Sequence, residues 1–296
     1  MITSKSPLAV ARVAYAVAGK ALPSYSHGKS PHKFTLPQLA ACLVLKEFFT
    51  TDYRGIAAIL EDTTDLRRVL ELTSVPHFTT LQKAATRLTS RRAVRRLIMS
   101  TLAMARRSGI AADPVRLAAL DGTGFESRHV SRYFTERRDH DLARVPYARF
   151  PKASILADTS NHLIITGIPA LGPRYDITHF KPALDAAAPV AGITTLAADA
   201  GYDSEANHAY ARETHGIRLI APAYQRRWKT IPRGRYRRQM YLRFPAKVYR
   251  QRWQIETVMS MLKRNFGSFL RARSYWSQCR EILLRLVAHN ILIVRG

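Results

Sequence analysis

Apolar residues recur at helical spacing through the first third of the chain. Between residues 35 and 107 they return every three or four positions, which is the repeat of a helix with one buried face. Polar residues that favour helix starts divide this stretch into short segments. Thr35 is expected to cap the first helix and Asp52 the second, while Thr79 or Thr80 is expected to cap a later one.

A strongly basic helix is expected to close this series, because four arginines follow at helical spacing: Arg91, Arg92, Arg95 and Arg96. Short helices with a capped basic helix late in the series are typical of helix-turn-helix DNA-binding modules. A plain helical bundle with a solvated basic face would give the same pattern. We therefore predict an all-helical domain over residues 35–112, with DNA binding as its expected role. Residues 1–34 are expected to form an N-terminal arm, either amphipathic or poorly ordered, because Arg12 interrupts their apolar run and excludes a signal peptide.

The pattern changes to short strands and helices after Pro114. One apolar run ends at Asp121, two further runs flank a turn at residues 159–161, and another run ends at Asp199. Runs of this length bounded by turn residues predict buried strands. Helical segments lie between and after them, so the order predicts a mixed α/β sheet with helices on its faces. The expected domains after the helical one are the sheet domain, residues 113–270, and a C-terminal helix, residues 271–296.

Positive charge dominates the composition, with 47 Lys and Arg against 21 Asp and Glu and a formal net charge of +26. Such an excess predicts nucleic acid as the partner. It is concentrated in residues 225–252, which contain no acid and interleave cations with aromatic residues. We interpret residues 225–247 as a basic linker that contacts DNA phosphates, although a solvated charge run would look the same. The cations expected to contact DNA in this linker are Arg226, Arg227, Lys229, Arg233, Arg235, Arg237 and Arg238.

Other classes of protein receive no support from the sequence. No apolar run approaches the roughly 20 residues that span a bilayer, so no membrane association is expected. Cys42 and Cys279 lie far apart and fit no metal spacing, which predicts two reduced thiols in a cytosolic protein. No glycine-rich nucleotide-binding motif occurs, so a nucleotide-driven mechanism is not expected.

Two acids, Asp121 and Asp199, follow strand-like runs. Side chains at the carboxyl ends of neighbouring strands meet at one edge of an open α/β sheet, and Glu256 on a packed helix could join them there. Three carboxylates form an all-oxygen site that suits Mg²⁺ or Mn²⁺ and not zinc. Two such ions, about 4 Å apart, would activate a water or a 3′-hydroxyl and stabilise the leaving oxygen of a phosphodiester.

A stripe of residues around the third acid supports this interpretation. Steps of three, four and seven residues separate Tyr249, Arg252, Glu256 and Lys263. Such steps return to nearly the same face of an α-helix. A carboxylate between two cations can hold a metal ion while the cations hold the phosphates of a substrate. Trp253, in the same segment, is expected to lie in the core.

Each acid also has a structural interpretation. Asp121 and Asp199 could cap the turns that follow them, and Glu256 could pair with Arg252 four residues earlier. Ser204 or Asp203 is expected to cap the next helix, and Asp203 is not expected to bind metal. The combination favours the catalytic interpretation, because a structural role does not require acids at two strand ends together with the helix stripe.

The chain resembles the DDE transposases of insertion sequences of the IS4 and IS5 kind. The resemblance rests on a strand followed by Asp121-Gly122-Thr123, on the D-x-G-Y-D-S segment that begins at Asp199, and on the Y-x2-R-x3-E-x6-K signature, which Tyr249, Arg252, Glu256 and Lys263 meet in full. The segment VPHFTTLQKAATRL also looks like the helical segment that precedes the catalytic domain in these enzymes. The helix signature is specific once it is joined to the other two motifs.

The resemblance implies an RNase H-like core in which Asp121, Asp199 and Glu256 are catalytic and ligate two Mg²⁺ or Mn²⁺ ions. It further implies contacts with the transposon end by Tyr249, Arg252 and Lys263. The short interval between the second and third acids favours an enzyme of the IS5 type, without the large β-rich insertion of some IS4 members.

A transposase of this kind would bind terminal inverted repeats, hydrolyse the phosphodiester at each end of the element and join the freed 3′ ends to a target duplex. Two ends must be held together, so a homodimer or larger assembly on double-stranded DNA is expected, in the cytoplasm at the nucleoid. Two alternatives stay open: an RNase H-like structure-specific nuclease that only hydrolyses, and a catalytically inactive DNA-binding relative.

Overall fold

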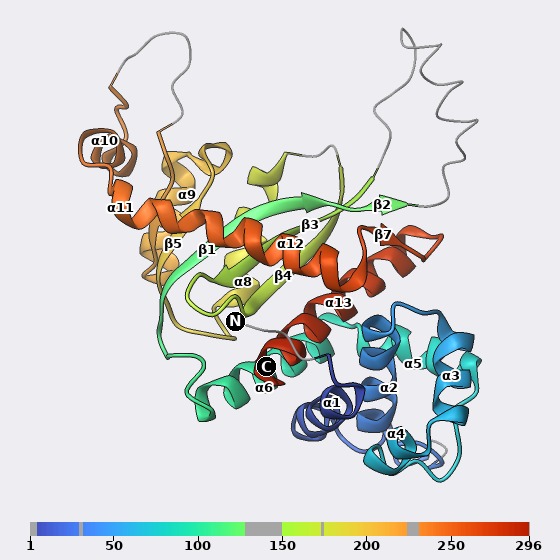
Figure 1. Cartoon of the computed structure of the whole chain (residues 1–296). Coiled ribbons are helices and arrows are strands. Elements are labelled where there is room, and N and C mark those ends of the chain that lie inside the picture. Colours follow the sequence, from blue (N-terminus) through green and yellow to red (C-terminus); the bar gives the residue numbers. More distant parts are fainter. Residues whose placement is uncertain (1–4, 30–31, 128–149, 173–174, 224–230, 296) are drawn as a thin grey trace, which may run out of the picture.

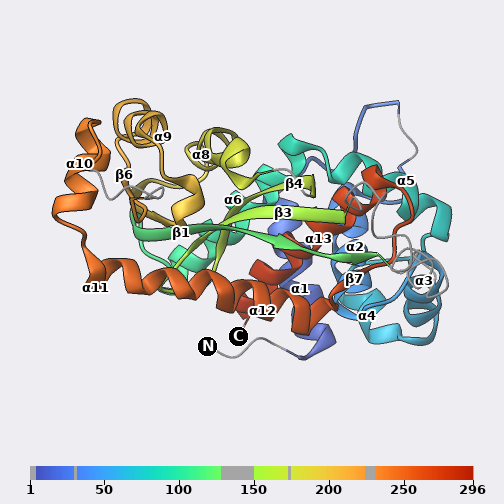
Figure 2. The same cartoon turned by 90° about the horizontal axis from the view of Figure 1, so that it is seen from above.

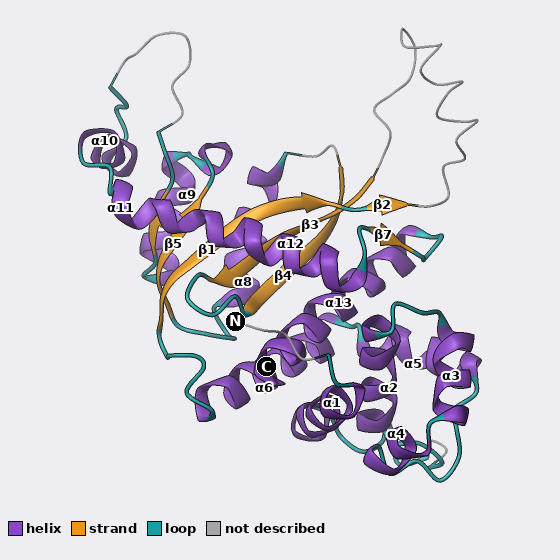
Figure 3. Cartoon of the chain, in the orientation of Figure 1, coloured by secondary structure: helices purple, strands orange, loops and turns teal. Residues whose placement is uncertain are grey.

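A computed structural model describes residues 5–29, 32–127, 150–172, 175–223 and 231–295 of the chain. The N-terminal helices gather on one side of the molecule and a mixed β-sheet lies on the other (Figure 1). Figure 3 shows the same division by secondary structure, with the long C-terminal helix placed between the two parts.

The helices that precede the sheet are α1 (Pro7–Ala21), α2 (Leu36–Phe48), α3 (Tyr53–Asp62), α4 (Thr64–Val69), α5 (Phe78–Leu88) and α6 (Arg91–Arg107). Two predicted caps are confirmed. The Thr35 hydroxyl accepts a hydrogen bond from the Gln38 amide, and the Gln38 side chain accepts one from the Thr35 amide, so the two form a capping box. The Asp52 carboxylate accepts from the Gly55 amide at the start of α3.

The start of α5 differs from the prediction. The helix begins at Phe78, so Thr79 and Thr80 lie inside its first turn and cap nothing. His77 occupies the cap position without a side-chain cap, and its Nδ1 lies 2.8 Å from the Thr79 hydroxyl. The earlier start places the Phe78 ring under the Arg54 guanidinium of α3, 4.5 Å from the ring centroid.

Residues 7–21 form a regular helix that belongs to the helical layer instead of a separate arm. One face of α1 is fully buried, including Val10 and Val17. This face packs against α2, α6 and the C-terminal helix. A hydrogen bond of 2.9 Å from the Ser100 hydroxyl of α6 to the Val17 carbonyl joins the two helices.

The predicted mixed sheet is confirmed, with strand order β4-β3-β1-β5-β6. Its strands are β1 (Val115–Gly124), β3 (Phe150–Asp158), β4 (Ile164–Gly172), β5 (Ile193–Ala198) and β6 (Arg218–Ile220). The pairs β1–β3 and β3–β4 are antiparallel, and β1–β5 and β5–β6 are parallel. The expected hairpin at residues 159–161 joins β3 to β4. A short pair of strands, β2 (Glu126–Ser127) and β7 (Phe269–Leu270), lies apart from this sheet.

Helices cover both faces of the sheet. The helices that follow β4 along the chain are α8 (Phe180–Ala187), α9 (Glu205–Ala209), α10 (Arg235–Leu242), α11 (Ala246–Tyr249), α12 (Gln254–Phe266) and α13 (Tyr275–Arg295), and of these α10 packs on α9. Figure 2 shows α12 along one face and α8 and α9 on the opposite side, in agreement with the contacts of α12 with β1 and β3 and of α8 with β3 and β4. None of the helices that the structure describes is both long and apolar enough to cross a membrane.

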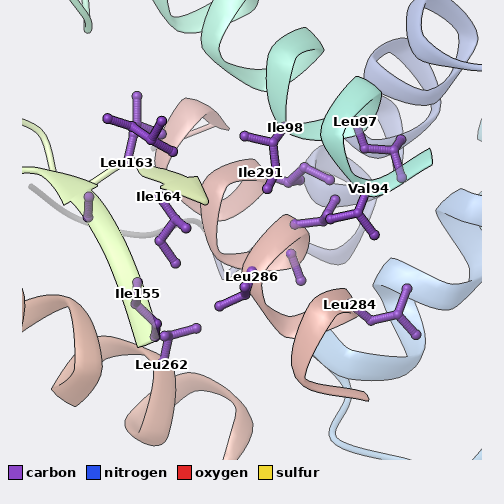
Figure 4. Close-up of a cluster of buried hydrophobic side chains, with 14 of the residues drawn as sticks. Val94, Leu97, Ile98, Ile155, Leu163, Ile164, Leu262, Leu284, Leu286 and Ile291 are labelled. Carbon is purple, nitrogen blue, oxygen red and sulfur yellow. The ribbon is translucent and has the colours of Figure 1, made fainter. Parts of the chain in front are cut away.

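The helical layer and the sheet share one hydrophobic core. Helix α13 joins them, because it packs against α1, α2 and α6 on one side and against β3 and β4 on the other. Figure 4 shows part of this core, with side chains from α6, α12, α13, β3 and β4. Residues buried there include Val94, Leu97, Ile98, Ile155, Ile164, Leu262, Leu286 and Ile291.

Candidate active site

Sheet register brings the first two acids together. Strand β1 pairs in parallel with β5, and Leu120 lies opposite Ala198. Asp121 and Asp199 are the next residues on each side, so their backbones are neighbours at the same level of the sheet. The charge of Asp199 reaches Asp121, where it contributes to raising the pKa.

Asp121 lies within β1 and not at its end, which corrects the prediction. The strand continues to Gly124 because residues 122–124 pair with residues 152–154 of the antiparallel neighbour β3. Asp199 does follow the last residue of its strand, as predicted.

Each aspartate also stabilises its own turn. One carboxylate oxygen of Asp121 accepts from the Gly122 amide at 2.7 Å, and one of Asp199 accepts from the Ala200 amide at 2.8 Å. The structural interpretation therefore holds for one oxygen of each acid. The second oxygen of Asp121 faces residue Arg252, just before α12.

The third acid comes from the first turn of α12. The helix stripe is not carried by one continuous α-helix, because α11 ends at Tyr249 and a 3₁₀ turn covers residues 250–253 before α12 begins. The i to i+4 relation between Arg252 and Glu256 survives this change. Arg252 Nη2 donates to Glu256 Oε1 at 3.0 Å.

The same arginine reaches across to the sheet. Arg252 Nη1 donates to Asp121 Oδ2 at 3.0 Å, so one guanidinium bridges Asp121 and Glu256. The structure thus brings Asp121, Asp199, Glu256 and Arg252 into one site, built from a central strand, the end of its parallel neighbour and a packed helix.

Burial and charge act in opposite directions on the ionisation of this site. Burial raises the pKa of Asp121, and the Asp199 charge adds to this, while the Gly122 amide and Arg252 oppose it. Burial also raises the pKa of Tyr249, where Arg252 opposes it and Asp199 and Asp121 add to it. Burial disfavours the charged form of Arg252, but Tyr249 and the three acids outweigh this and raise its pKa.

The remaining stripe residues are placed differently. Tyr249 is partly buried and lies close enough to Arg252 for the guanidinium charge to affect its pKa. Lys263 is partly exposed in the last turn of α12, about 10 Å along the helix from Glu256. The prediction that Trp253 lies in the core is wrong: its side chain is 54% exposed, because the 3₁₀ turn directs it away from the sheet.

A second polar cluster lies beside β1 and was missed from sequence. The Lys152 ammonium donates to Asp176 Oδ1 at 2.7 Å, and the Ser154 hydroxyl lies 3.1 Å from His179 Nδ1. The Tyr202 hydroxyl is buried nearby; burial raises its pKa, followed by the charges of Asp176, Asp121 and Asp199. These residues come from β3 and from turns after β4 and β5, so no local spacing could indicate their proximity.

Asp203 neither caps the next helix nor faces the acids. Its buried carboxylate accepts from Arg237 Nε at 2.8 Å and lies 3.2 Å from His208 Nε2. Ser204 is the cap, with its hydroxyl accepting from the Asn207 amide. Arg237, which was expected to contact DNA, is thus held in an ion pair with Asp203, just before α9.

The basic helix α10 is anchored by acids of the preceding helices. Glu205 accepts from the backbone amides of Tyr236 and Arg237, both at 3.0 Å, and Glu213 accepts from the Tyr236 hydroxyl. These contacts hold α10 so that three predicted DNA-contacting cations are exposed: Arg233, Arg235 and Arg238. The other three predicted cations, Arg226, Arg227 and Lys229, lie outside the described residues.

The donor set suits a hard divalent cation, because Asp121, Asp199 and Glu256 offer only carboxylate oxygens. Among the described residues, however, no three acidic, histidine or cysteine side chains are gathered tightly enough to hold one ion. The Arg252 guanidinium stands between two of the acids and keeps them apart.

Comparisons with known proteins agree with this geometry. None of the curated proteins compared with the chain matches it. The family model described as the transposase DDE domain matches residues 115–291, which is more than half of the chain and includes all three acids. The five-stranded mixed sheet with flanking helices fits the RNase H-like core expected of such a domain. The chain therefore belongs to the family of transposases with a DDE domain.

Proposed function

We propose that the chain is the transposase of an insertion sequence of the IS4 and IS5 kind, with Asp121, Asp199 and Glu256 as its catalytic acids and metal ligands. The observation that carries this proposal is the junction of β1, β5 and α12. Register places the two aspartates side by side, and Arg252 ties the glutamate to the first of them.

The three acids would hold Mg²⁺ or Mn²⁺. Two ions would be needed to stabilise both the attacking and the leaving oxygen. Such ions supply a nucleophile at neutral pH and neutralise charge on the leaving oxygen. Both DNA steps are in-line displacements at phosphorus, so one site serves end hydrolysis and the later attack of the freed 3′-hydroxyl on target DNA.

The protein's own groups would position the DNA. Arg252 and Lys263 are the cations of α12 and its preceding turn that bind phosphates of the transposon end, and Tyr249 lies close to them. The exposed arginines of α10 and the loop before it, Arg233, Arg235 and Arg238, extend this cationic surface.

The helical layer would read the terminal inverted repeats. Its α5 and α6 present exposed polar and basic faces, with Lys83, Arg87, Arg91, Arg92, Arg95 and Arg96 exposed. Between β5 and α12 the described residues contain a single further strand, β6, which supports the IS5 type. Because two ends must be joined, we expect a dimer or larger assembly on DNA.

The test is Glu256→Gln. End cleavage with Mg²⁺ should be lost while binding to a duplex that carries the terminal repeat is kept. Glu61→Gln, an exposed acid of α3 in the helical layer, is the matched control and should cleave normally. Normal cleavage by Glu256→Gln would show that the catalytic assignment is wrong. A strand-transfer assay with a pre-cut end separates a transposase from a nuclease that only hydrolyses.

A further inference from the structure

The arrangement of Arg252 is unusual for a residue whose expected role is to bind phosphate. Its two terminal nitrogens are both committed to carboxylates of its own chain, one on a strand and one on a helix. Its side chain is 20% exposed, so the pair with Asp121 is formed largely out of water. A cation in this position neutralises part of the negative charge of the neighbouring carboxylates.

Arg252 occupies one carboxylate oxygen of each of the two acids that a metal ion between Asp121 and Glu256 would need. Asp121 Oδ1 already accepts from the Gly122 amide, which leaves Oδ2 as its outward-facing oxygen, and that oxygen accepts from Arg252. Glu256 Oε1 accepts from the same guanidinium. A divalent cation between these acids and the arginine therefore exclude each other by space and by charge.

Arginine suits this role because its guanidinium stays charged at all accessible pH values and has a planar fork that can donate to two carboxylates at once. Without a counter-ion, ionised acids brought together in a partly buried site would repel one another. The guanidinium removes that repulsion when no metal ion is bound.

We propose that Arg252 is the internal counter-ion of the metal-free catalytic centre, and that binding of a divalent ion between Asp121 and Glu256 displaces its guanidinium and frees it for DNA phosphates. This inference rests on the proposed function, since it assigns the metal to the same acids. Arg252 is then a positioning residue before the metal ion binds and a phosphate ligand afterwards, so metal loading and DNA engagement are coupled through one side chain.

The test is the affinity of the full chain for Mn²⁺ alone, without DNA, measured by electron paramagnetic resonance of the free ion at pH 8. Arg252→Gln removes the charge and should bind Mn²⁺ more tightly, by about twofold to fivefold, which corresponds to the strength of partly exposed ion pairs. Arg252→Lys keeps one charge but not the fork, and should fall between this variant and the wild type. Arg250→Gln, an exposed arginine two residues earlier, is the matched control and should bind like the wild type.

A purely structural arginine would give the opposite sign, because its loss would disorder the acids and weaken Mn²⁺ binding. Equal or weaker binding by Arg252→Gln, while Asp121→Asn loses Mn²⁺, overturns this inference and leaves the metal site intact. Retained Mn²⁺ affinity in Asp121→Asn overturns the metal site itself, and the inference with it. Circular dichroism establishes whether each variant is folded. If Arg252→Gln does not fold, Arg252→Lys is compared with the wild type in its place.

Discussion

Gly122 and Asp176 lie so close together that a side chain at position 122 has no room. A Cβ built on Gly122 would lie 2.7 Å from Asp176 Oδ1, the oxygen that accepts from Lys152. The glycine next to Asp121 thus allows the ion pair between Lys152 and Asp176 to pack against β1.

Gly122→Ala is expected to push Asp176 away from Lys152 and to lower the free energy of unfolding by about 1–3 kcal/mol, the usual cost of overpacking. The measurement is urea denaturation followed by circular dichroism. Gly192→Ala is the control, because its Cβ would meet Pro114 at an ordinary contact distance of 3.4 Å. Equal stability of Gly122→Ala and the wild type would show that the close approach has no consequence.

Arg237 and Arg238 are adjacent in sequence but should behave differently. Arg237→Ala removes the arginine that pairs with the buried Asp203 and should lower the melting temperature. Arg238 is exposed, so Arg238→Ala should leave the melting temperature unchanged and weaken DNA binding at all sequences. The slope of the logarithm of affinity against the logarithm of salt should decrease by about 1 for Arg238→Ala. A lower melting temperature in Arg238→Ala and an unchanged one in Arg237→Ala would contradict the anchoring of α10.

Arg285 connects α13 to the end of α12 through a buried network. Its side chain is 1% exposed and donates to the Gly267 and Phe269 carbonyls and to Glu281. Arg285→Met keeps the volume but removes the arginine from the buried Glu281, and also from Glu47 of α2, which keeps its ion pair with Lys46. We expect a loss of about 3–5 kcal/mol in the free energy of unfolding.

The control for this network is Arg295→Met at the exposed end of the same helix, which should change stability little. A loss of similar size in both variants would mean that the network contributes nothing specific.

His289 should make the protein sensitive to mild acid. It is fully buried and donates from Nε2 to the His162 carbonyl, and burial lowers its pKa to about 4. In the unfolded chain this histidine titrates near pH 6.5, so the unfolded chain binds the proton before the folded protein does. The contribution of neutral His289 to stability is therefore present above pH 6.5 and is lost as the pH falls toward 4. The loss amounts to about 3 kcal/mol by linkage.

His289→Gln should remove this part of the pH dependence, since glutamine can keep the hydrogen bond without titrating. The measurement is the free energy of unfolding of both proteins at steps between pH 7 and pH 4. Parallel curves for the two proteins would contradict the assignment to His289.

The sequence predicted those features that depend on local pattern. The capping box at Thr35, the hairpin between β3 and β4 and the i to i+4 relation of Arg252 to Glu256 all follow from spacing alone. The proximity of Asp121 and Asp199 followed from the rule that neighbouring strands present their ends together.

Features that depend on distant pairing were wrong or missed. Strand β1 extends past Asp121 because its residues 122–124 pair with residues 152–154 of β3, which lie far along the chain. Helix α1 is buried against α6 and α13 as well as α2, and the Asp203–Arg237 pair joins the turn before α9 to α10. Trp253 is exposed because a 3₁₀ turn interrupts the expected helix, which hydrophobicity could not show.

A crystal structure of the protein with Mn²⁺, in which anomalous scattering locates the ion, tests the proposed catalytic site most directly. Mn²⁺ should be bonded to carboxylate oxygens of Asp121 and Asp199, with Glu256 turned toward it. Manganese bound elsewhere, with these three acids facing away from it, would show that they do not form the metal site.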